Sequence, residues 1–238
     1  MLAKAISLKF NKKSMERRRL IGNAKDWYIS DGLIAMWDGE FNAGDAHNSS
    51  ATTWKDMIGG YVLNGTNATW GDKYAVFGGS TFFTTTNSSI RSILNTGKSV
   101  EIVYKTTDTS AYQMMFCANG WYICALQASG VGLKGFNPGG ANVPENFYSN
   151  SAVQDTNIHT YSAQYPTWGL VVDNVTQSTA TKNGNGVDTG SYFIGKRTYN
   201  GSNGGWCKGS MYCLRIYNKV LTADEIAHNY NIDLQRFV

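Results

Sequence analysis

The feature that most constrains this fold is a succession of short β-patterned segments separated by turn signals. Asn-Gly occurs six times, and each pair suits a tight turn with positive φ between antiparallel strands. About a dozen segments between the turns are rich in β-branched and aromatic residues. The 238 residues include only three prolines, and long helical periodicity is absent away from the two ends. The composition predicts an all-β sandwich rather than a series of βαβ units.

Val100, Ile102 and Tyr104 alternate with Glu101, Val103 and Lys105, as in a sheet with one buried face. The predicted strands are separated by turn signals. They are Tyr28–Trp37, Tyr61–Leu63, Tyr74–Phe77, Thr81–Thr85, Ser99–Thr106, Tyr112–Cys117, Trp121–Gln127, Gly132–Gly135, His159–Tyr165, Gly169–Val175, Val187–Gly195 and Met211–Tyr217. The long polar segment 135–157 interrupts this series. A segment of this length within a compact domain is typical of a functional loop.

The clearest local pattern is the closing stretch, Gly209–Tyr230. Thr222 stands three residues before Glu225, which is the spacing of a capping box, so a short helix is predicted from roughly Ala223 to Tyr230. The preceding strand should pair near the first one, Gly32–Trp37. Alternation divides this closing strand into one face with Tyr212, Leu214 and Ile216 and another with Met211, Cys213, Arg215 and Tyr217.

Charge divides the chain into an arm and a domain. Residues 1–25 contain eight Lys or Arg and one acidic residue, whereas residues 26–238 contain 13 basic and 16 acidic residues. We therefore predict a basic N-terminal arm at residues 1–27 and one domain at residues 28–238. The arm is either a solvated tail, disordered unless it docks, or a segment that docks onto an acidic partner or nucleic acid. No signal peptide and no transmembrane helix are predicted.

Four cysteines lack the spacing of a zinc site. They are Cys117, Cys124, Cys207 and Cys213. Cys117 and Cys124 flank an Asn-Gly turn, and a two-residue hairpin would place them as diagonal neighbours, which is a poor geometry for a disulfide. We expect mostly buried thiols and synthesis in a reducing cytosol.

The two ends of the chain together resemble a known family. The opening carries Asp31–Gly39 (DGLIAMWDG), His47, Ala51–Asp56 and Gly59-Gly60, and the closing part carries Ile194-Gly195, Leu214–Thr222 (LRIYNKVLT), Glu225-Ile226 and Asn229-Tyr230. These motifs resemble the concanavalin A-like lectin/glucanase jelly roll, and within it the laminin-G-like branch common in bacterial and phage proteins. The resemblance covers roughly residues 28–233. It implies a jelly-roll β-sandwich of two antiparallel sheets in which the first and last strands share a sheet.

The resemblance alone does not choose a function, because the family includes lectins, adhesion modules and hydrolases. Hydrolytic relatives carry carboxylates at alternate positions of one strand, in the form E-x-D-x-(x)-E. No such run occurs here, and the nearest pair is Asp38-Gly39-Glu40 at a predicted strand end. We therefore predict that the chain is not an enzyme.

Many relatives bind calcium through loop oxygens, so calcium is the one cofactor that the resemblance suggests. Asp38, Asp45 and Asp56 cluster in an early loop region, but they lack the D-x-[DN]-x-[DN]-G spacing. The alternative interpretation is that these carboxylates cap turns.

Glycan sites combine an aromatic platform with Asn, Asp and Gly hydrogen-bonding groups on loops. Trp206 follows Asn203 closely, with Tyr199 just upstream, and this is the best such group in the sequence. Trp121 at a hairpin turn and Tyr148 in the long loop are further ligand-binding candidates. The alternative role for each aromatic is core or turn packing.

The sequence thus predicts a non-catalytic surface or adhesion module that binds a glycan or a host-surface receptor. An adhesive fold without an export signal suits a phage virion structural protein of the tail, fibre or capsid surface, with the arm contacting other virion proteins. A homo-oligomer fits the same setting, and no membrane partner is expected. The alternatives are a purely structural decoration protein without a glycan ligand and, less favoured, a glycoside hydrolase.

Overall fold

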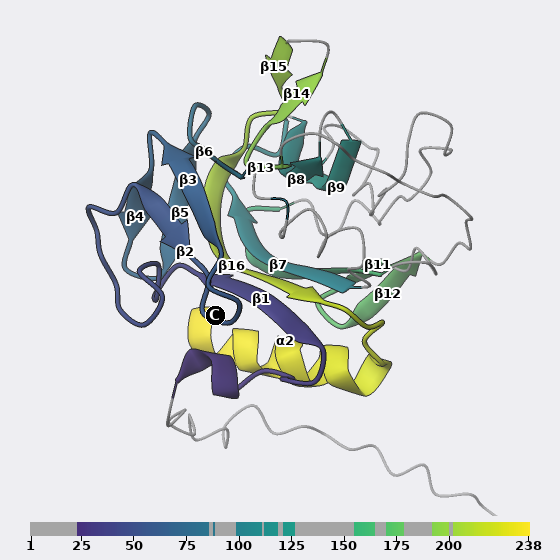
Figure 1. The fold of residues 1–238 in the computed structure, drawn as a ribbon. Coiled ribbons are helices and arrows are strands. Elements are labelled where there is room, and N and C mark those ends of the chain that lie inside the picture. Colours follow the sequence, from purple (N-terminus) through teal and green to yellow (C-terminus); the bar gives the residue numbers. More distant parts are fainter. Residues whose placement is uncertain are drawn as a thin grey trace, which may run out of the picture.

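The computed structural model describes residues 23–85, 88, 99–110, 112–118, 121–126, 155–164, 170–178, 192–199 and 202–238. Two antiparallel sheets dominate it (Figure 1). The eight-stranded sheet contains β1 (Leu33–Asp38), β4 (Thr69–Gly71), β5 (Tyr74–Gly78), β7 (Ser99–Thr106), β10 (Ile158–Gln164), β11 (Leu170–Val172), β12 (Val175–Ser178) and β16 (Lys208–Tyr217). The six-stranded sheet contains β2 (Thr53–Lys55), β3 (Val62–Thr66), β6 (Phe82–Thr85), β8 (Gln113–Ala118), β9 (Trp121–Leu126) and β13 (Tyr192–Ile194).

In the described part of the chain, four elements lie outside the two large sheets. A 3-10 turn, η1 (Ala24–Asp26), precedes the first sheet strand, and α2 (Ala223–Phe237) ends the chain. β14 (Arg197–Tyr199) and β15 (Ser202–Gly204) form a separate two-stranded ribbon that flanks Asn200-Gly201. This ribbon projects beyond the end of β13 (Figure 1).

The last strand is the centre of its sheet. β16 pairs with β7 along its length, with β5 over its first residues and with β1 over its last. Trp37 of β1 lies opposite Leu214 of β16, which confirms that the first and closing strands are neighbours. The predicted all-β sandwich of two antiparallel sheets is also confirmed.

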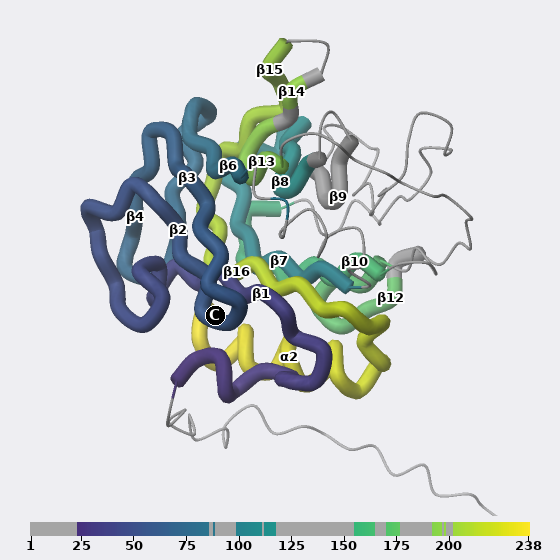
Figure 2. The backbone as a smooth tube through the Cα atoms, in the orientation of Figure 1, coloured from purple at the N-terminus to yellow at the C-terminus, as the bar shows by residue number. Residues whose placement is uncertain are grey.

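The molecule has three layers, because α2 covers the outer face of the eight-stranded sheet (Figures 1 and 2). The main core lies between the two sheets and includes Trp37, Trp54, Phe83, Tyr161 and Leu214, all nearly inaccessible to solvent. A second apolar cluster lies between this sheet and α2, and Ala24 and Tyr28 belong to it. The outer face of the six-stranded sheet has no helix over it among the described residues.

The C-terminal helix begins where the sequence predicts and continues further. The Thr222 side chain accepts from the Glu225 N–H, and the Glu225 carboxylate accepts from the Thr222 N–H, so the capping box is confirmed. The prediction of a short helix ending near Tyr230 is wrong, because α2 runs to Phe237. Its second half is held by Ile232 and Phe237, which pack against the sheet, and by buried ion pairs from the same turns.

The predicted faces of β16 are correct only in its second half. Leu214 and Ile216 face the main core, but Met211 joins them there, whereas Tyr212 faces α2. The cause is a register shift between Met211 and Cys213 in the ladder with β7. A β-bulge of this kind places two residues opposite one and reverses the alternation beyond it.

Several other strands differ from their predicted bounds. The predicted strand Gly169–Val175 is divided into β11 and β12 by a turn at Asp173 and Asn174, both with positive φ. β4, β14 and β15 were not predicted, and Gly132–Gly135 lies outside the described residues. In the β8–β9 hairpin, Cys117 lies opposite Tyr122 as expected, but a register shift places Cys124 opposite Phe116 rather than Met115. The thiols of Cys117, Cys207 and Cys213 are buried.

The N-terminal segment that the structure describes packs onto the domain. Ala24 is fully buried, Tyr28 is 3% exposed, and the Ile29 N–H donates to Asn229 of α2. Residues 1–22 of the predicted basic arm lie outside the described residues. Among the described helices, none is long and apolar enough to cross a membrane.

Candidate functional site

Three aromatic rings gather around one lysine on the outer face of the six-stranded sheet. Phe83 and Ile194 point into the main core, so their neighbours Phe82 on β6 and Phe193 on β13 point outward. The Lys196 ammonium lies 3.8 Å from the centre of the Phe82 ring and 4.9 Å from that of Phe193. The third ring, Trp206, follows β15. We call Phe82, Phe193, Lys196, Asn203 and Trp206 the Lys196 cluster.

Two glycines bring the parts of this cluster together. Gly195 has φ +93°, and a Cβ there would lie 2.2 Å from the Phe77 ring, so only glycine turns the chain tightly here. Gly205 has φ +60° and packs against Met114 of β8, whose N–H donates to the Gly205 carbonyl. These turns place Lys196 and Trp206 over the edge of β6 and β13, beside the β14–β15 ribbon.

The rings and the cation pack as one unit. Phe82 lies 6.2 Å from Phe193 and 6.0 Å from Trp206, in tilted and edge-to-face arrangements. The Trp206 ring centre is 5.4 Å from the Lys196 ammonium, within the range of a cation–π contact. Burial lowers the pKa of Lys196 from its usual value. All three rings remain partly exposed, so a ligand can reach their surface.

Polar groups line the edge of the rings. The Asn203 side-chain oxygen accepts from the Lys196 ammonium at 3.0 Å and from the Thr198 hydroxyl at 2.8 Å. Asn203 is exposed, and within the described part of the chain its amide nitrogen meets no acceptor. The indole N–H of Trp206 likewise donates to no described group. Two donors are therefore available to a ligand beside an aromatic surface.

The outer face of the sheet continues with polar side chains. Asn64 and Thr66 on β3 are exposed and lie opposite Thr84 and Phe82 of β6. The Thr84 hydroxyl donates to the Tyr192 carbonyl. A row of small polar groups beside the aromatic rings suits a ligand that carries many hydroxyl groups.

The predicted ligand-binding residues fall into two groups. Trp206 and Asn203 both contact Lys196. Tyr199 lies on β14 and Trp121 begins β9, but their side chains lie outside what the structure describes, as does the whole of Tyr148.

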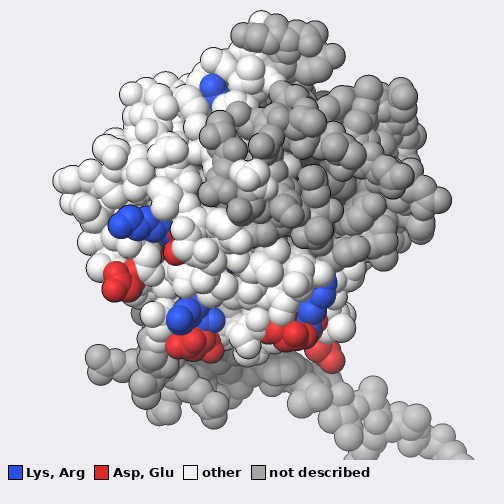
Figure 3. All heavy atoms as spheres, viewed as in Figure 1, with Lys and Arg blue, Asp and Glu red and all other residues white. Residues whose placement is uncertain are grey.

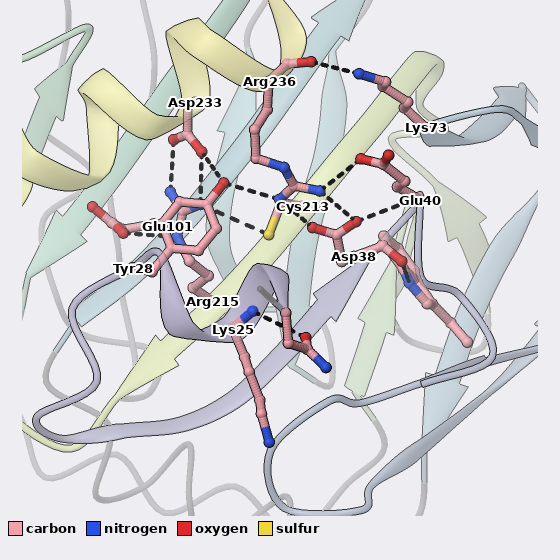
Figure 4. A network of polar contacts seen from close by, with 12 residues as sticks. Lys25, Tyr28, Asp38, Glu40, Lys73, Glu101, Cys213, Arg215, Asp233 and Arg236 are labelled. Carbon is pink, nitrogen blue, oxygen red and sulfur yellow. Dashed lines mark hydrogen bonds and ion pairs between the residues drawn. The ribbon is translucent and has the colours of Figure 1, made fainter. Parts of the chain in front are cut away.

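The densest group of charges lies elsewhere, between α2 and the eight-stranded sheet (Figure 4). Arg215 of β16 forms two hydrogen bonds of 2.7 Å with Asp233 of α2 and one of 2.9 Å with Glu101 of β7. Asn229 also donates to Glu101, and Tyr28 donates to Asp233. We call this group, together with Arg236, Asp38 and Glu40, the α2 network.

The second arginine of the α2 network holds the predicted strand-end carboxylates. Arg236 donates to both oxygens of Asp38, at 2.6 and 3.1 Å, and to Glu40 at 3.0 Å. Asp38 is inaccessible to solvent, and Arg215 and Glu101 are too. Burial raises the pKa of the Glu101 carboxyl, whereas Arg215 opposes that change. Asp38 and Asp233 each accept two hydrogen bonds from an arginine, and Glu101 accepts through one oxygen while its Oε1 is buried without a partner in the described part of the chain. These ion pairs hold α2 on the sheet, and Glu40, with a side chain 35% exposed, is the most accessible carboxylate of the group.

The three calcium candidates lie in different surroundings. Asp56 is buried, and its carboxylate accepts from the backbone N–H groups of Met36, Ile58, Gly59 and Tyr61. Asp45 is exposed, whereas Asp38 is paired with Arg236. Among the described residues, no group of three or more His, Cys, Asp or Glu side chains is arranged to hold a metal ion. Asp56 is instead a turn cap, which was its alternative interpretation.

No protein-family model matches the chain, and no curated protein matches its sequence. Solved structures are similar in fold. Trypanosoma rangeli sialidase in complex with 2,3-difluorosialic acid aligns with a TM-score of 0.62 at 11% identity, over 86% of this chain. The alignment covers 33% of that sialidase, so the chain spans about a third of its length.

Two similar structures are matched over almost their own whole length. Domain 4 of AbnA, a GH43 extracellular arabinanase from Geobacillus stearothermophilus, in complex with arabinotriose, has a TM-score of 0.53 at 14% identity, over 83% of this chain and 97% of that domain. The CBM40 of the Ruminococcus gnavus IT-sialidase has a TM-score of 0.50 at 16% identity, over 68% and 96%. At these identities the likeness shows the fold, a β-sandwich that carbohydrate-binding domains also adopt.

Phe82, Phe193 and Lys196 were not among the predicted site residues. Strand alternation could have indicated the two phenylalanines, because each adjoins a residue of the core face. Lys196 follows Gly195 directly, but no local pattern indicates that its ammonium lies over a ring 114 positions away in the sequence.

Proposed function

We propose that this chain is a non-catalytic glycan-binding module whose site is the Lys196 cluster. The proposal rests on one observation: three partly exposed aromatic rings share a solvent-facing sheet surface with donors that no described protein group uses. Sugars offer apolar C–H faces for stacking and hydroxyl groups for hydrogen bonding, and this surface matches both. The near-complete structural matches to the arabinotriose-bound arabinanase domain and to the sialidase CBM40 support the same function.

The direct test compares glycan affinity among single variants. Wild-type protein is titrated with arabino-oligosaccharides and screened on a glycan array, and the best ligand is then measured with Trp206→Ala and Phe193→Ala. Loss of one stacking ring should weaken binding about tenfold or more. Phe41→Ala is the matched control, because Phe41 is a half-buried ring beside Arg236 and α2. Equal affinities in all four proteins would place the site elsewhere, and a blank array would favour a decoration protein that contacts only other proteins.

The alternative function, a glycoside hydrolase, can be tested with the same purified protein. Asp38 and Glu40 are the carboxylates that the sequence offers for such chemistry, and both bind Arg236. Reducing sugar released by wild type, and abolished by Glu40→Gln, would support a glycoside hydrolase. We expect no release from either protein.

We further propose that the chain belongs to the laminin-G-like branch and is a structural protein of a phage virion. The support is the sequence resemblance and the eight basic residues of the first 25, which suit docking onto an acidic partner. A deletion of residues 1–21 tests the arm and keeps Ala24 and Tyr28, which pack under α2. The truncated protein should fold and bind glycan but fail to join particles. Normal incorporation would contradict the anchoring role.

A further inference from the structure

Lys196 differs from the other buried cations of the described residues. As a whole residue it is 5% exposed, close to Arg236 at 6% and Arg215 at 0%. Both arginines pair with carboxylates within 3.0 Å, whereas Lys196 has no acidic partner in the described part of the chain. Buried lysines are rare unless they are paired, because removing the ammonium from water is costly. The positive charge of Lys196 is thus left for a group that the described protein does not supply.

The neighbours of Lys196 stabilise its charge without neutralising it. Phe82, Phe193 and Trp206 contribute only their ring quadrupoles, and Asn203 contributes one neutral oxygen. A cation against these rings offsets the negative potential of their faces. The platform therefore favours an electron-rich or anionic group more than three rings alone would.

Charged side chains of the described residues are unevenly distributed over the surface. On the face shown in Figure 3, acidic side chains of the described residues lie in the lower half, and the upper part carries basic but no acidic colour. Another lysine, Lys208, already binds Asp108 at 2.8 Å. The Lys196 cluster itself contains no acidic side chain, so an anion bound there would meet no carboxylate of the cluster.

We infer that the glycan bound at the Lys196 cluster is anionic, with a carboxylate or sulfate group directed toward Lys196. This inference rests on the proposed glycan-binding function of the same site. One ring stacks on the sugar face, the Trp206 and Asn203 donors meet hydroxyl groups, and the ammonium attracts the charged substituent. Lys196 is then the specificity-determining residue of the cluster, and the rings supply affinity common to acidic and neutral sugars.

Pairs of sugars, each an acidic sugar and a neutral counterpart, separate the effect of charge on affinity from the effect of shape. The probes are oligogalacturonate and its carboxyl-reduced form, sialyllactose and lactose, and a sulfated oligosaccharide and its desulfated form. Each is titrated into wild-type, Lys196→Met, Lys196→Arg and Trp206→Ala proteins. Lys196→Met keeps an unbranched side chain that can pack on the rings, and it removes the charge together with the hydrogen bond to Asn203. Thermal unfolding of each variant establishes that it is folded.

At least one acidic probe should bind wild type about tenfold or more tightly than its neutral partner, the size expected for one charge-assisted hydrogen bond. Lys196→Met should remove that difference, and Lys196→Arg should keep most of it. The preference should also shrink as ionic strength rises from about 0.01 M to about 1 M, because the Debye length falls from about 30 Å to about 3 Å. The salt series uses wild type alone, so it remains decisive even if Lys196→Met fails to fold.

Different failures have different meanings. If acidic and neutral partners bind equally and Trp206→Ala weakens both, the inference about charge is overturned and the proposed function stands. If no probe binds wild type and a broad glycan array is also blank, the proposed function fails and the inference falls with it.

Discussion

The α2 network and the Lys196 cluster surround their cations with different kinds of groups. Both hold cations largely away from water. In the α2 network each guanidinium meets carboxylates from other elements, so Arg215 joins β16 to α2 through Asp233 and to β7 through Glu101 (Figure 4). In the Lys196 cluster the ammonium meets three rings and one amide. Cations paired with carboxylates hold a fold together, whereas a cation that has no carboxylate partner and lies beside partly exposed rings suits a binding surface.

The largest expected effect comes from breaking the α2 network. Asp233→Ala removes both acceptors of the Arg215 fork and leaves that buried guanidinium with Glu101 as its one carboxylate partner among the described residues. The free energy of unfolding should fall by about 3 to 5 kcal/mol, the usual cost of removing one partner of a buried ion pair. Urea unfolding measures the change.

Asp224→Ala is the control for that variant, because Asp224 is exposed in the first turn of the same helix. It should cost less than about 1 kcal/mol through the helix dipole. If Asp233→Ala were no more harmful than its control, the network would not be what holds α2 on the sheet. Glycan affinity should be the same in both variants wherever they are folded.

An ion pair between a histidine and two aspartates at the start of β10 should make the free energy of unfolding depend on pH. His159 binds Asp173 at 2.5 Å and Asp155 at 2.9 Å. Burial alone would lower the pKa of His159, but the hydrogen bonds to Asp173 and Asp155 and the charges of both carboxylates raise it above 6.5. Because the folded-state pKa is the higher one, the stabilisation is complete below about pH 6.5 and is lost as the pH rises through the folded value.

His159→Gln should therefore cost about 1 to 2 kcal/mol near pH 6 and less near pH 9. The free energy of unfolding of both proteins, measured across that range, checks this prediction. A constant difference between the two proteins would mean that His159 contributes through packing and not through its charge.

A smaller effect is expected at the start of α2. Thr222→Ala removes the acceptor for the Glu225 N–H and half of the capping box. The loss should be about 1 kcal/mol. Glycan affinity should not change, since the cap lies on the layer opposite the Lys196 cluster. A loss of binding in a folded Thr222→Ala protein would contradict the location of the site.

The smallest effect on stability is expected in the Lys196 cluster itself. Lys196→Met replaces a cation–π contact with a thioether–aromatic contact of similar size. The free energy of unfolding should change by less than about 1 kcal/mol, as measured in urea. A loss comparable to that of Asp233→Ala would show that Lys196 holds the fold and is not reserved for a ligand.

The contrast between the two regions also explains what the sequence could predict. The capping box at Thr222 and Glu225, the pairing of the first and last strands, and the sandwich all follow from local patterns or from motifs at the chain ends. The bulge near Tyr212 could not be predicted, because alternation carries no signal for an inserted residue. The α2 helix is longer than predicted, although Asn229, Asp233 and Arg236 repeat at helical spacing on the buried face.

The candidate site can be predicted only where its residues are neighbours in the sequence. Trp206 and Asn203 are three positions apart, so one local pattern indicates both. Phe82 and Lys196 meet through the pairing of β6 with β13, and that pairing follows from the topology of the whole sheet. Long-range contacts of this kind are set by the global fold.

The most direct test of the central claim is a nitrogen–proton NMR titration that observes the tryptophan indole signals. The Trp206 signal is assigned with Trp206→Phe, and an acidic and a neutral oligosaccharide are added in turn. We predict that the Trp206 indole signal shifts with saturation while those of Trp37 and Trp54 in the core stay fixed. A shift confined to Trp27 beside α2, with Trp206 unchanged at saturating sugar, would contradict the account.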